Sequence, residues 1–166
     1  YPGVNKQVYY KEGIFVGYRH FDTHKVKPLY PFGFGLSYTT FRYGEPTITP
    51  QGDGWEIGVD VTNTGQVEGK EVVQLYLGIA PRKSKKSHTA SAMSVVERPT
   101  KELRDFTKVS LMPGETKHVR LHLTPQDLAY WDESVHGWVI EPARYCAYVC
   151  ASSEDVRGTV LLQFEP

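Results

Sequence analysis

Short runs in which apolar and polar residues alternate recur from Trp55 to the end of the chain, with turn residues between them. Residues 55–61 form one such run, and the same period of two returns at 73–79 and 119–123. Alternation with this period is typical of a strand that is buried on one face only. Several short strands, with turns rather than long helices between them, predict an all-β fold, an antiparallel β-sandwich of about seven strands.

Turn residues mark where the predicted strands end. Asn63-Thr-Gly65 and Met112-Pro-Gly-Glu115 are both tight-turn signals. Near the end of the chain, the polar loop 152–155 suits a hairpin between strands at 144–151 and 157–164. These turns divide the sequence into strands of the length that a sandwich needs.

One short helical turn is predicted between the strands. Thr124 is followed by a proline and, three positions on, by Asp127, which is the pattern of a capped helix start. We expect this turn to end near Tyr130.

The first 37 residues differ from the rest of the chain. They are rich in Tyr, Phe, Gly and Pro and show no sustained helical or alternating period, which predicts an irregular N-terminal tail. So many aromatic side chains are costly to leave in water, so we expect this tail to lie against another domain. The chain begins at Tyr1 without an initiator Met, which we interpret as an internal cut in a longer protein.

Composition argues against several classes of partner. The chain carries 19 basic and 19 acidic residues, so no net charge attracts it to nucleic acid or to a membrane surface. We therefore predict no nucleic-acid partner and no membrane partner. Cys146 and Cys150 share one face of a predicted strand about 13 Å apart, too far for a disulfide. Four histidines, His20, His24, His118 and His122, lack ligand partners at metal-site spacing, and we predict neither a metal nor another cofactor.

The carboxylates form no recognisable catalytic pair. Glu12 and Asp22 lie in the tail, Asp127 is explained as a helix cap, and Asp132 and Glu133 as turn residues. A glycosidase needs two carboxyl groups about 5 Å or about 6.5 to 9.5 Å apart across a sugar pocket. We therefore assign no catalytic residue and expect the chain alone to be inactive.

Trp131 and Trp138 are candidates for an aromatic platform that stacks on sugar rings. They flank a turn, where a large ring often plugs the open end of a sandwich, so packing within the fold is the alternative interpretation. The platform interpretation predicts that the chain binds a polysaccharide or plant-wall polymer.

Two segments near the start of the chain carry a specific resemblance. These are Tyr10-Lys-Glu-Gly-Ile-Phe-Val-Gly-Tyr-Arg19 and Pro28-Leu-Tyr-Pro-Phe-Gly-Phe-Gly-Leu-Ser-Tyr-Thr-Thr-Phe41. They resemble the C-terminal end of family 3 glycoside hydrolases. The remainder resembles the fibronectin type III-like domain of many of these β-glucosidases, through motifs at 61–65, 69–76, 98–106 and 111–115.

This resemblance implies an immunoglobulin or fibronectin type III-like sandwich at 38–166. Residues 1–37 would be the end of an α/β sandwich domain and the linker. In the family, the nucleophilic aspartate and the acid/base glutamate belong to domains that precede this region, so no role is carried onto Glu12. The implied parent hydrolyses terminal β-D-glucosides with retention, and its catalytic domains are the implied partner, within one chain or as a cleaved chain. Phe32, Phe34, Tyr38 and Phe41 would anchor the linker by burial.

One departure from the family pattern is a longer segment at 81–96. It contains a basic cluster that could form a contact loop reaching the catalytic cleft or a second subunit, and the alternative is a solvated insertion. The cluster residues are Arg82, Lys83, Lys85, Lys86 and His88.

The sequence leaves the association state and the location of the chain open. It is compatible with a homodimer. It is also compatible with an independent adhesive surface domain, although the aromatic tail argues against that interpretation. The family resemblance favours an extracellular or periplasmic location.

Overall fold

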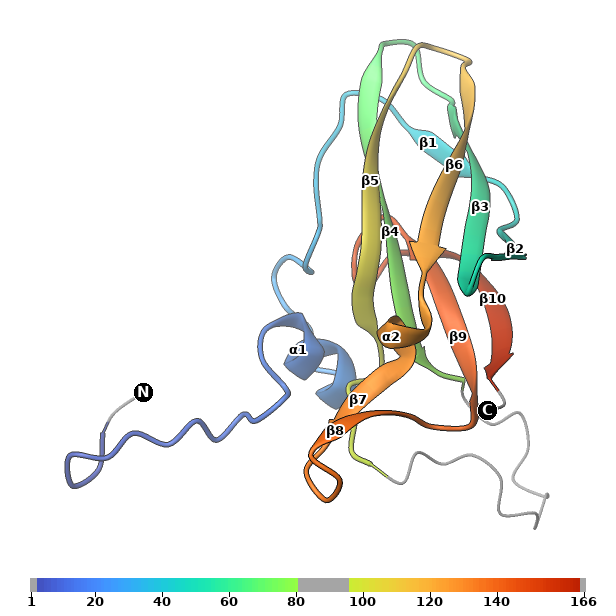
Figure 1. Ribbon diagram of the computed structural model, residues 1–166. Helices are drawn as coiled ribbons and strands as arrows, with labels where there is room; N and C mark the ends of the chain where they lie inside the picture. Colours follow the sequence, from blue (N-terminus) through green and yellow to red (C-terminus); the bar gives the residue numbers. More distant parts are fainter. Residues whose placement is uncertain (1–2, 81–95, 165–166) are drawn as a thin grey trace, which may run out of the picture.

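The computed structural model describes residues 3–80 and 96–164. Two antiparallel four-stranded sheets face each other, and a two-stranded hairpin and two short helices lie outside them (Figure 1). In chain order the elements are α1 (Tyr18–His24), β1 (Phe41–Tyr43), β2 (Thr47–Gln51), β3 (Gly54–Asn63), β4 (Gly69–Ile79), β5 (Glu102–Leu111), β6 (Thr116–Leu123), α2 (Pro125–Leu128), β7 (Ala129–Asp132), β8 (Gly137–Ile140), β9 (Ala143–Cys150) and β10 (Val156–Phe164).

The first sheet is built around β3. Strand β6 pairs along one edge of β3, with Val59 opposite Val119. Along the other edge lie β1 and then β2, which together form one interrupted edge strand. The interruption falls at residues 44–46, where Gly44 N–H donates to the Asp60 carbonyl at 2.8 Å and Pro46 supplies no donor.

The second sheet has the strand order β10-β9-β4-β5. Strand β4 pairs with β9 at the centre and with the edge strand β5, and the β4–β5 pairing shifts register between Leu75 and Tyr76. A second shift occurs in the β9–β10 pairing between Val156 and Gly158. Gly158 lies against Pro46, and a side chain at 158 would collide with that proline ring.

The core lies between the two sheets. Alternate residues of each strand point into it, as the period of two predicts, and each fully buried aliphatic side chain contributes about 1.5 to 3 kcal/mol. The buried apolar residues include Ile57, Val59, Val61, Val73, Leu75, Leu77, Val119, Leu121, Leu123, Tyr145, Ala147, Val149 and Leu162. The predicted all-β antiparallel sandwich is confirmed.

One buried tyrosine fixes the turn into β9. Tyr145 Oη donates to the Glu141 carbonyl four residues upstream at 2.7 Å. This is the tyrosine-corner arrangement of immunoglobulin-like sandwiches, in which a buried hydroxyl ties a connection to the strand that follows.

The predicted helical turn is confirmed, although it is shorter than expected. Thr124 and Asp127 form a reciprocal capping box, and Asp127 Oδ2 accepts from Thr124 N–H at 2.8 Å. The helix ends at Leu128 rather than near Tyr130, because Ala129–Asp132 pairs with Gly137–Ile140 as β7 and β8.

Two expectations need correction. The described residues contain ten strands rather than about seven, because the first edge strand is split and the β7–β8 hairpin adds two strands outside the sandwich. The tail is not irregular throughout, because Tyr18–His24 is helical and the segment after it follows the outer face of the second sheet. Residues 3–16 run away from the sandwich (Figure 1).

The two cysteines are free and lie on one strand, as predicted, and both are buried. Among the described residues, no helix is long and apolar enough to cross a membrane.

Candidate functional site

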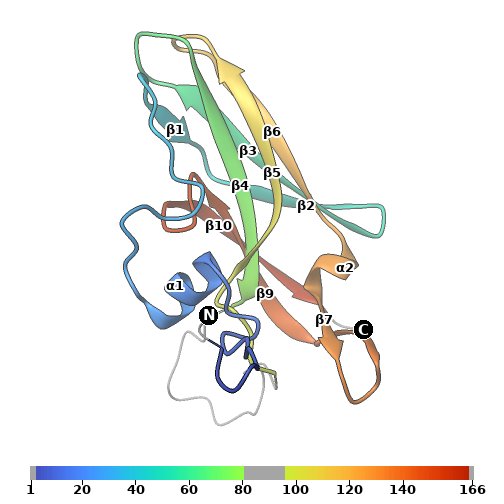
Figure 2. The ribbon, with the colours of Figure 1, turned by 90° about the vertical axis from the view of Figure 1, so that its left-hand side faces the viewer.

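The N-terminal segment is attached to the outer face of the second sheet. Helix α1 lies beside the lower halves of β4 and β5 in Figures 1 and 2. Tyr18 Oη accepts from the Leu103 N–H at 2.8 Å, and Thr23 Oγ1 accepts from the Thr100 N–H at 3.1 Å. Both contacts satisfy backbone donors at the start of β5, so the helix covers groups that would otherwise need water.

Ion pairs strengthen this attachment. Lys101 Nζ lies 2.5 Å from Asp22 Oδ2, with side chains that are 11% and 4% exposed. Arg19 Nε lies 3.2 Å from Glu102 Oε1 in a more exposed position. Buried charges need partners, and the Lys101–Asp22 pair therefore constrains the position of α1 far more than the Arg19–Glu102 pair does.

An aromatic cluster fills the space between the helix and the sheet. The Tyr18 ring stacks on Phe32 with centroids 4.8 Å apart and meets Tyr76 edge to face at 5.8 Å. Lys101 Nζ lies 5.6 Å from the centroid of Tyr76. Burial raises the pKa of Tyr76, so its hydroxyl stays protonated and donates to Gln74 Oε1 at 2.6 Å.

The chain beyond α1 is held by the backbone and by Gln74. Ser153 N–H donates to the Phe32 carbonyl at 2.8 Å, and Gln74 Nε2 donates to the Gly33 carbonyl at 3.4 Å. The same Gln74 amide donates to the Ala151 carbonyl at 2.8 Å. Gly33 has φ of 78°, and a side chain there would collide with Gln74, so only glycine suits this position.

A second attachment follows at Thr39. Thr39 Oγ1 donates to Asn63 Oδ1 at 2.5 Å in a buried site. Asn63 Nδ2 donates to the carbonyls of Val67 and Leu111 at 2.8 and 2.9 Å. Gly65 N–H also donates to Asn63 Oδ1, so every hydrogen-bonding position of this amide is occupied.

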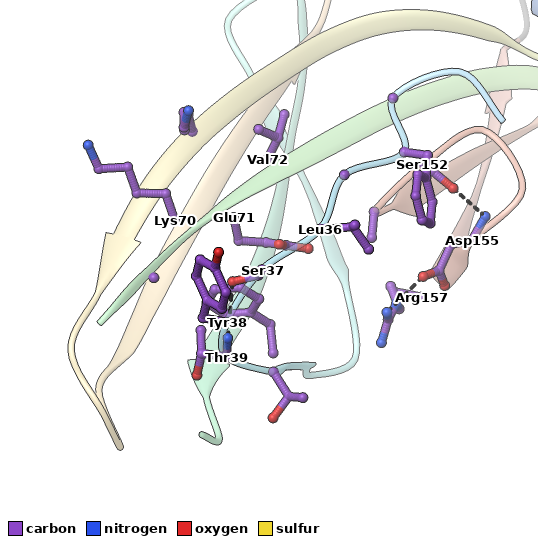
Figure 3. A pocket seen from close by; sticks show the side chains of 18 of the residues that line it. Leu36, Ser37, Tyr38, Thr39, Lys70, Glu71, Val72, Ser152, Asp155 and Arg157 are labelled. Atoms are coloured by element: carbon purple, nitrogen blue, oxygen red, sulfur yellow. Dashed lines mark hydrogen bonds and ion pairs between the residues drawn. The ribbon is translucent and has the colours of Figure 1, made fainter. Parts of the chain in front are cut away.

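An open groove lies beside these attachments. It is lined by the segment 31–41, the first residues of β4 and the loop 151–157. In the view of Figure 3, Leu36 lies between Glu71 on one side and Ser152 and Asp155 on the other. Leu36 and Tyr38 are 91% and 102% exposed.

The floor of the groove carries a partly buried acid. Tyr43 Oη donates to Glu71 Oε1 at 2.8 Å, and the Arg157 guanidinium lies 5.4 Å from the Tyr43 ring centroid. Burial raises the pKa of Glu71, although Tyr43 and Arg157 oppose the shift in part. Burial and the neighbouring Glu71 charge raise the pKa of Tyr43.

The predicted anchoring aromatics behave differently from one another. Phe41 packs against the core, Phe32 stacks on Tyr18, and Phe34 stacks on Tyr30 with centroids 5.4 Å apart. Tyr38 does not anchor the linker within this chain, because its side chain is fully exposed.

The candidate acids have structural partners. Asp22 pairs with Lys101, and Asp127 caps α2. Asp132 Oδ1 accepts from the N–H and hydroxyl of Ser134 at 2.8 and 2.6 Å, and these bonds lower the pKa of Asp132. The cap and turn roles predicted for Asp127 and Asp132 are confirmed.

The histidines are not gathered into one site. His20 and His24 meet on α1 with ring centroids 4.7 Å apart, whereas His118 Nδ1 lies 2.7 Å from Asp60 Oδ1 on the outer face of β6. Within residues 3–80 and 96–164, no group of three or more His, Cys, Asp or Glu side chains could hold a metal ion.

The two tryptophans lie opposite each other on the β7–β8 hairpin. Their rings meet edge to face with centroids 5.7 Å apart, and Trp131 and Trp138 are 50% and 61% exposed. The expectation that they plug the sandwich is wrong, because the hairpin projects beyond the two sheets (Figure 1). Arg98 holds the base of the hairpin, since its guanidinium lies 4.5 Å from the Tyr130 ring and pairs with Glu141 at 3.4 Å.

The predicted contact loop lies outside the described residues. This applies to Arg82, Lys83, Lys85, Lys86 and His88.

The attachment of α1 was not predicted from the sequence, because its hydrogen bonds and ion pairs join residues that lie about 80 positions apart in the chain. Tyr18 and Asp22 are four residues apart, as are Arg19 and Thr23, so all four lie on adjoining faces of the helix. This spacing was the only sign of the attachment in the sequence. It could not be interpreted without knowing the partners of these side chains in and beside β4 and β5.

Two antiparallel sheets closed by a tyrosine corner define an immunoglobulin-like β-sandwich module. A family model described as "Fibronectin type III-like domain" matches residues 71–153. The chain belongs to this family, and it corresponds to the C-terminal segment of family 3 glycoside hydrolases.

The relatives are much longer proteins. "Beta-glucosidase BoGH3A" of Bacteroides ovatus is 46% identical over 168 residues, which cover 99% of this chain and 21% of that protein. "Beta-glucosidase" of Rhizobium radiobacter is 46% identical over 163 residues, which cover 96% of this chain and 18% of that protein. The chain thus spans about a fifth of these relatives, in which the domain is part of one longer polypeptide.

A solved structure agrees with this assignment. The crystal structure of DesR, a β-glucosidase from Streptomyces venezuelae in complex with D-glucose, matches with a TM-score of 0.87 and 38% identity. The match covers 99% of this chain and 20% of that one.

Proposed function

We propose that this chain is a non-catalytic accessory domain of a family 3 β-glucosidase whose parent protein hydrolyses terminal β-D-glucosides with retention. The support is the similarity to β-glucosidases over nearly the whole chain together with the small share of those proteins that it spans. A retaining reaction needs a nucleophilic carboxylate and an acid/base carboxyl about 5 to 5.5 Å apart. In this proposal the remaining four-fifths of the polypeptide supplies both.

The observation that carries the proposal is the use of the acidic residues for structure. Asp22 is neutralised by Lys101, Asp127 caps a helix, and Asp132 closes a turn. These carboxylates are committed to neighbours within the fold, and they lie on three separate elements. None of the three lines the open groove, so they do not supply there the pair of carboxyl groups that glycoside hydrolysis requires.

The proposed domain boundaries and roles follow the family pattern. Residues 1–37 would be the end of an α/β sandwich domain and its linker, and residues 38–166 the accessory domain. The proposed partner is the set of catalytic domains of the same polypeptide, and the proposed contribution is stability through burial of apolar surface. Homodimerisation is a separate proposal, which size measurement of the whole protein would decide.

Hydrolysis of an aryl β-glucoside tests this function. The purified chain, with its mass verified, should release no aryl alcohol above the buffer rate, whereas the whole parent protein should turn over. Turnover that co-purifies with the 166-residue species would contradict the proposal, as would an inactive parent protein.

A second candidate function is favoured by the exposed Trp131–Trp138 pair. Two half-exposed indole rings on a projecting hairpin are a surface on which sugar rings could stack, which would make the chain a polysaccharide-binding module. Retention of the chain on insoluble cellulose, lost in a Trp131→Ala and Trp138→Ala double variant, would support this function. Tyr38→Ala is the matched control, because Tyr38 is an exposed aromatic elsewhere.

A further inference from the structure

We infer that the Trp131–Trp138 face of the β7–β8 hairpin is a binding site for a single, uncharged β-glucan chain, and that it takes neither a crystalline nor an acidic polysaccharide. The inference rests on the second candidate function proposed above and narrows it to one class of ligand. Three features of the hairpin support it, namely the way in which the hairpin is held, the angle between the two rings and the charges beside them.

The hairpin is held to the sandwich through one of its two faces. Side chains alternate along a strand, so Tyr130 and Asp132 share one face of β7, and Trp131 lies on the other. On the first face, Tyr130 Oη donates to Asp132 Oδ2 at 3.2 Å, and the Arg98 guanidinium lies 4.5 Å from the Tyr130 ring. Arg98 Nη1 also donates to the Leu128 carbonyl at 3.3 Å, at the base of the hairpin. These contacts fix the hairpin, while the two tryptophans on its other face stay half-exposed.

The turn at the end of the hairpin is fixed as well. Asp132 Oδ1 accepts from both the N–H and the hydroxyl of Ser134, at 2.8 and 2.6 Å. His136 has φ of 48°, a left-handed conformation that leads the turn into β8. The strands then pair with Trp131 directly opposite Trp138. Both rings are therefore held in place before a ligand arrives, which reduces the conformational entropy lost on binding.

The angle between the rings limits what they can hold. Their planes stand at 81° with centroids 5.7 Å apart, so no flat surface can stack on both rings at once. A crystalline cellulose face is flat, whereas one pyranose ring of a free glucan chain needs only one indole face, on which its C–H groups pack. We therefore expect retention on insoluble cellulose to come from its disordered chains.

The charges beside the rings favour an uncharged ligand. Asp132 directly follows Trp131, and Glu133 is exposed in the turn. Hydrogen bonds from Ser134 lower the pKa of Asp132, so this carboxylate is ionised at neutral pH. Two negative charges at the end of the hairpin repel polyuronates and other acidic polymers, whereas the hydroxyl groups of a neutral glucan can donate to the exposed Glu133.

The kind of sugar follows from the proposed activity of the parent protein. A protein that removes terminal β-D-glucosyl units acts at the ends of β-glucan chains. A second contact on the same chain would hold such an end near the protein, because linked contacts raise the effective concentration of each other's ligand.

Affinity electrophoresis of the whole parent protein tests the inference. A gel that contains soluble mixed-linkage β-glucan should retard the unaltered protein, and the Trp131→Ala and Trp138→Ala double variant should lose about tenfold or more in association constant. Val135→Ala is the matched control, because Val135 is an exposed apolar residue of the same turn without a ring for stacking, and it should be retarded like the unaltered protein.

Two further ligands test the geometry and the charge. Polygalacturonate in the gel should not retard the unaltered protein, and swollen cellulose should retain more of it than the same mass of microcrystalline cellulose. Equal retardation of the double variant and the unaltered protein in β-glucan, equal retention on the two celluloses, or a preference for polygalacturonate would overturn the inference.

A measurement on the unaltered protein covers the case in which the double variant does not fold. Hydrogen exchange of a peptide spanning 129–140 should slow when soluble β-glucan is added to the whole parent protein, and exchange at the β2–β3 turn, residues 52–53, should not change. Unchanged exchange in the hairpin would overturn the inference. An active parent protein that no glucan retards would also overturn it, but would leave the accessory-domain function supported. An inactive parent protein with tryptophan-dependent glucan binding would do the reverse.

Discussion

Lys101 Nζ and Asp22 Oδ2 are 2.5 Å apart, although the two residues are separated by 79 positions in the chain. Lys101 directly precedes β5, and Asp22 lies in the middle of α1. This nearly buried pair therefore joins the first helix to the outer face of the second sheet. It is the strongest electrostatic constraint on the position of the N-terminal segment, because both side chains have lost most of their water.

Removing one partner of this pair should be costly. Lys101→Met leaves the Asp22 carboxylate buried without a counter-charge, and we expect the free energy of unfolding to fall by about 3 kcal/mol. Urea unfolding of the chain followed by tryptophan fluorescence measures this change. Lys117→Met is the matched control, because Lys117 pairs with Glu115 at 3.3 Å in a solvent-exposed site, and this loss should be much smaller than that of Lys101→Met. Equal losses in the two variants would contradict the prediction.

Asn63 should not tolerate even its isosteric acid. Asn63→Asp removes both donors to the Val67 and Leu111 carbonyls and places a charge in a buried site, so we expect a loss of about 2 kcal/mol or more. Thermal unfolding measures this loss. Gln66→Glu makes the same amide-to-acid change at an exposed position nearby and should leave the midpoint within error. A stable Asn63→Asp variant would show that water replaces the lost bonds.

The two thiols should be inert in the folded chain. Burial raises the pKa of Cys150 to about 12 and also raises the pKa of Cys146, and the thiolate is the reactive species. At about pH 8, near the ordinary thiol pKa, a thiol-reactive dye should label neither residue on the timescale on which it labels both in guanidinium chloride. Rapid labelling of the native chain would mean that β9 opens readily.

Glu71 should make the chain less stable as pH rises. Burial raises the pKa of its carboxyl above the ordinary 4.5, so the folded state holds the proton more tightly than the unfolded chain does. The loss of folding stability caused by Glu71 is absent below the ordinary pKa of the unfolded chain, and it develops as pH rises through the raised pKa of the folded state. Glu71→Gln keeps an acceptor for Tyr43 and removes this ionisation.

Thermal unfolding midpoints measured at several pH values test whether ionisation of Glu71 lowers the stability of the chain. The difference in thermal midpoint by which the Glu71→Gln variant exceeds the unaltered chain should grow between about pH 4 and pH 7. Glu45→Gln changes an exposed carboxylate and should give no comparable trend. A midpoint difference that shrinks as pH rises would show that the charge of Arg157 affects the pKa of Glu71 more than burial does.

The sandwich was predictable because its determinants are local. Val59 and Val119 face the core in strands whose period of two is visible in the sequence, and the Thr124–Asp127 box spans only four residues. Helix α1 was not predictable in this way, because Tyr18 and Asp22 acquire their partners only after β4 and β5 have paired. Its seven residues contain no apolar period that a window could detect.

The exposure of the two tryptophans could not be predicted from the sequence for a related reason. Trp131 and Trp138 are large apolar residues of the kind that cores bury, but they pair with each other on the β7–β8 hairpin, which projects beyond the two sheets (Figure 1). The exposure of Tyr38 was likewise not visible in the sequence, because it depends on where the segment 33–39 attaches to the two sheets at Gly33 and Thr39.

The split edge strand has a consequence for self-association. An unbroken strand edge is a template on which a second copy can add a strand and begin to aggregate. Here β1 and β2 are short, and Pro46 lies at their junction against Gly158, where β10, the edge strand of the other sheet, is itself out of register. These two edges are thus irregular at the same place, so neither the β1–β2 edge nor the β10 edge offers a continuous row of backbone donors and acceptors to a neighbouring chain.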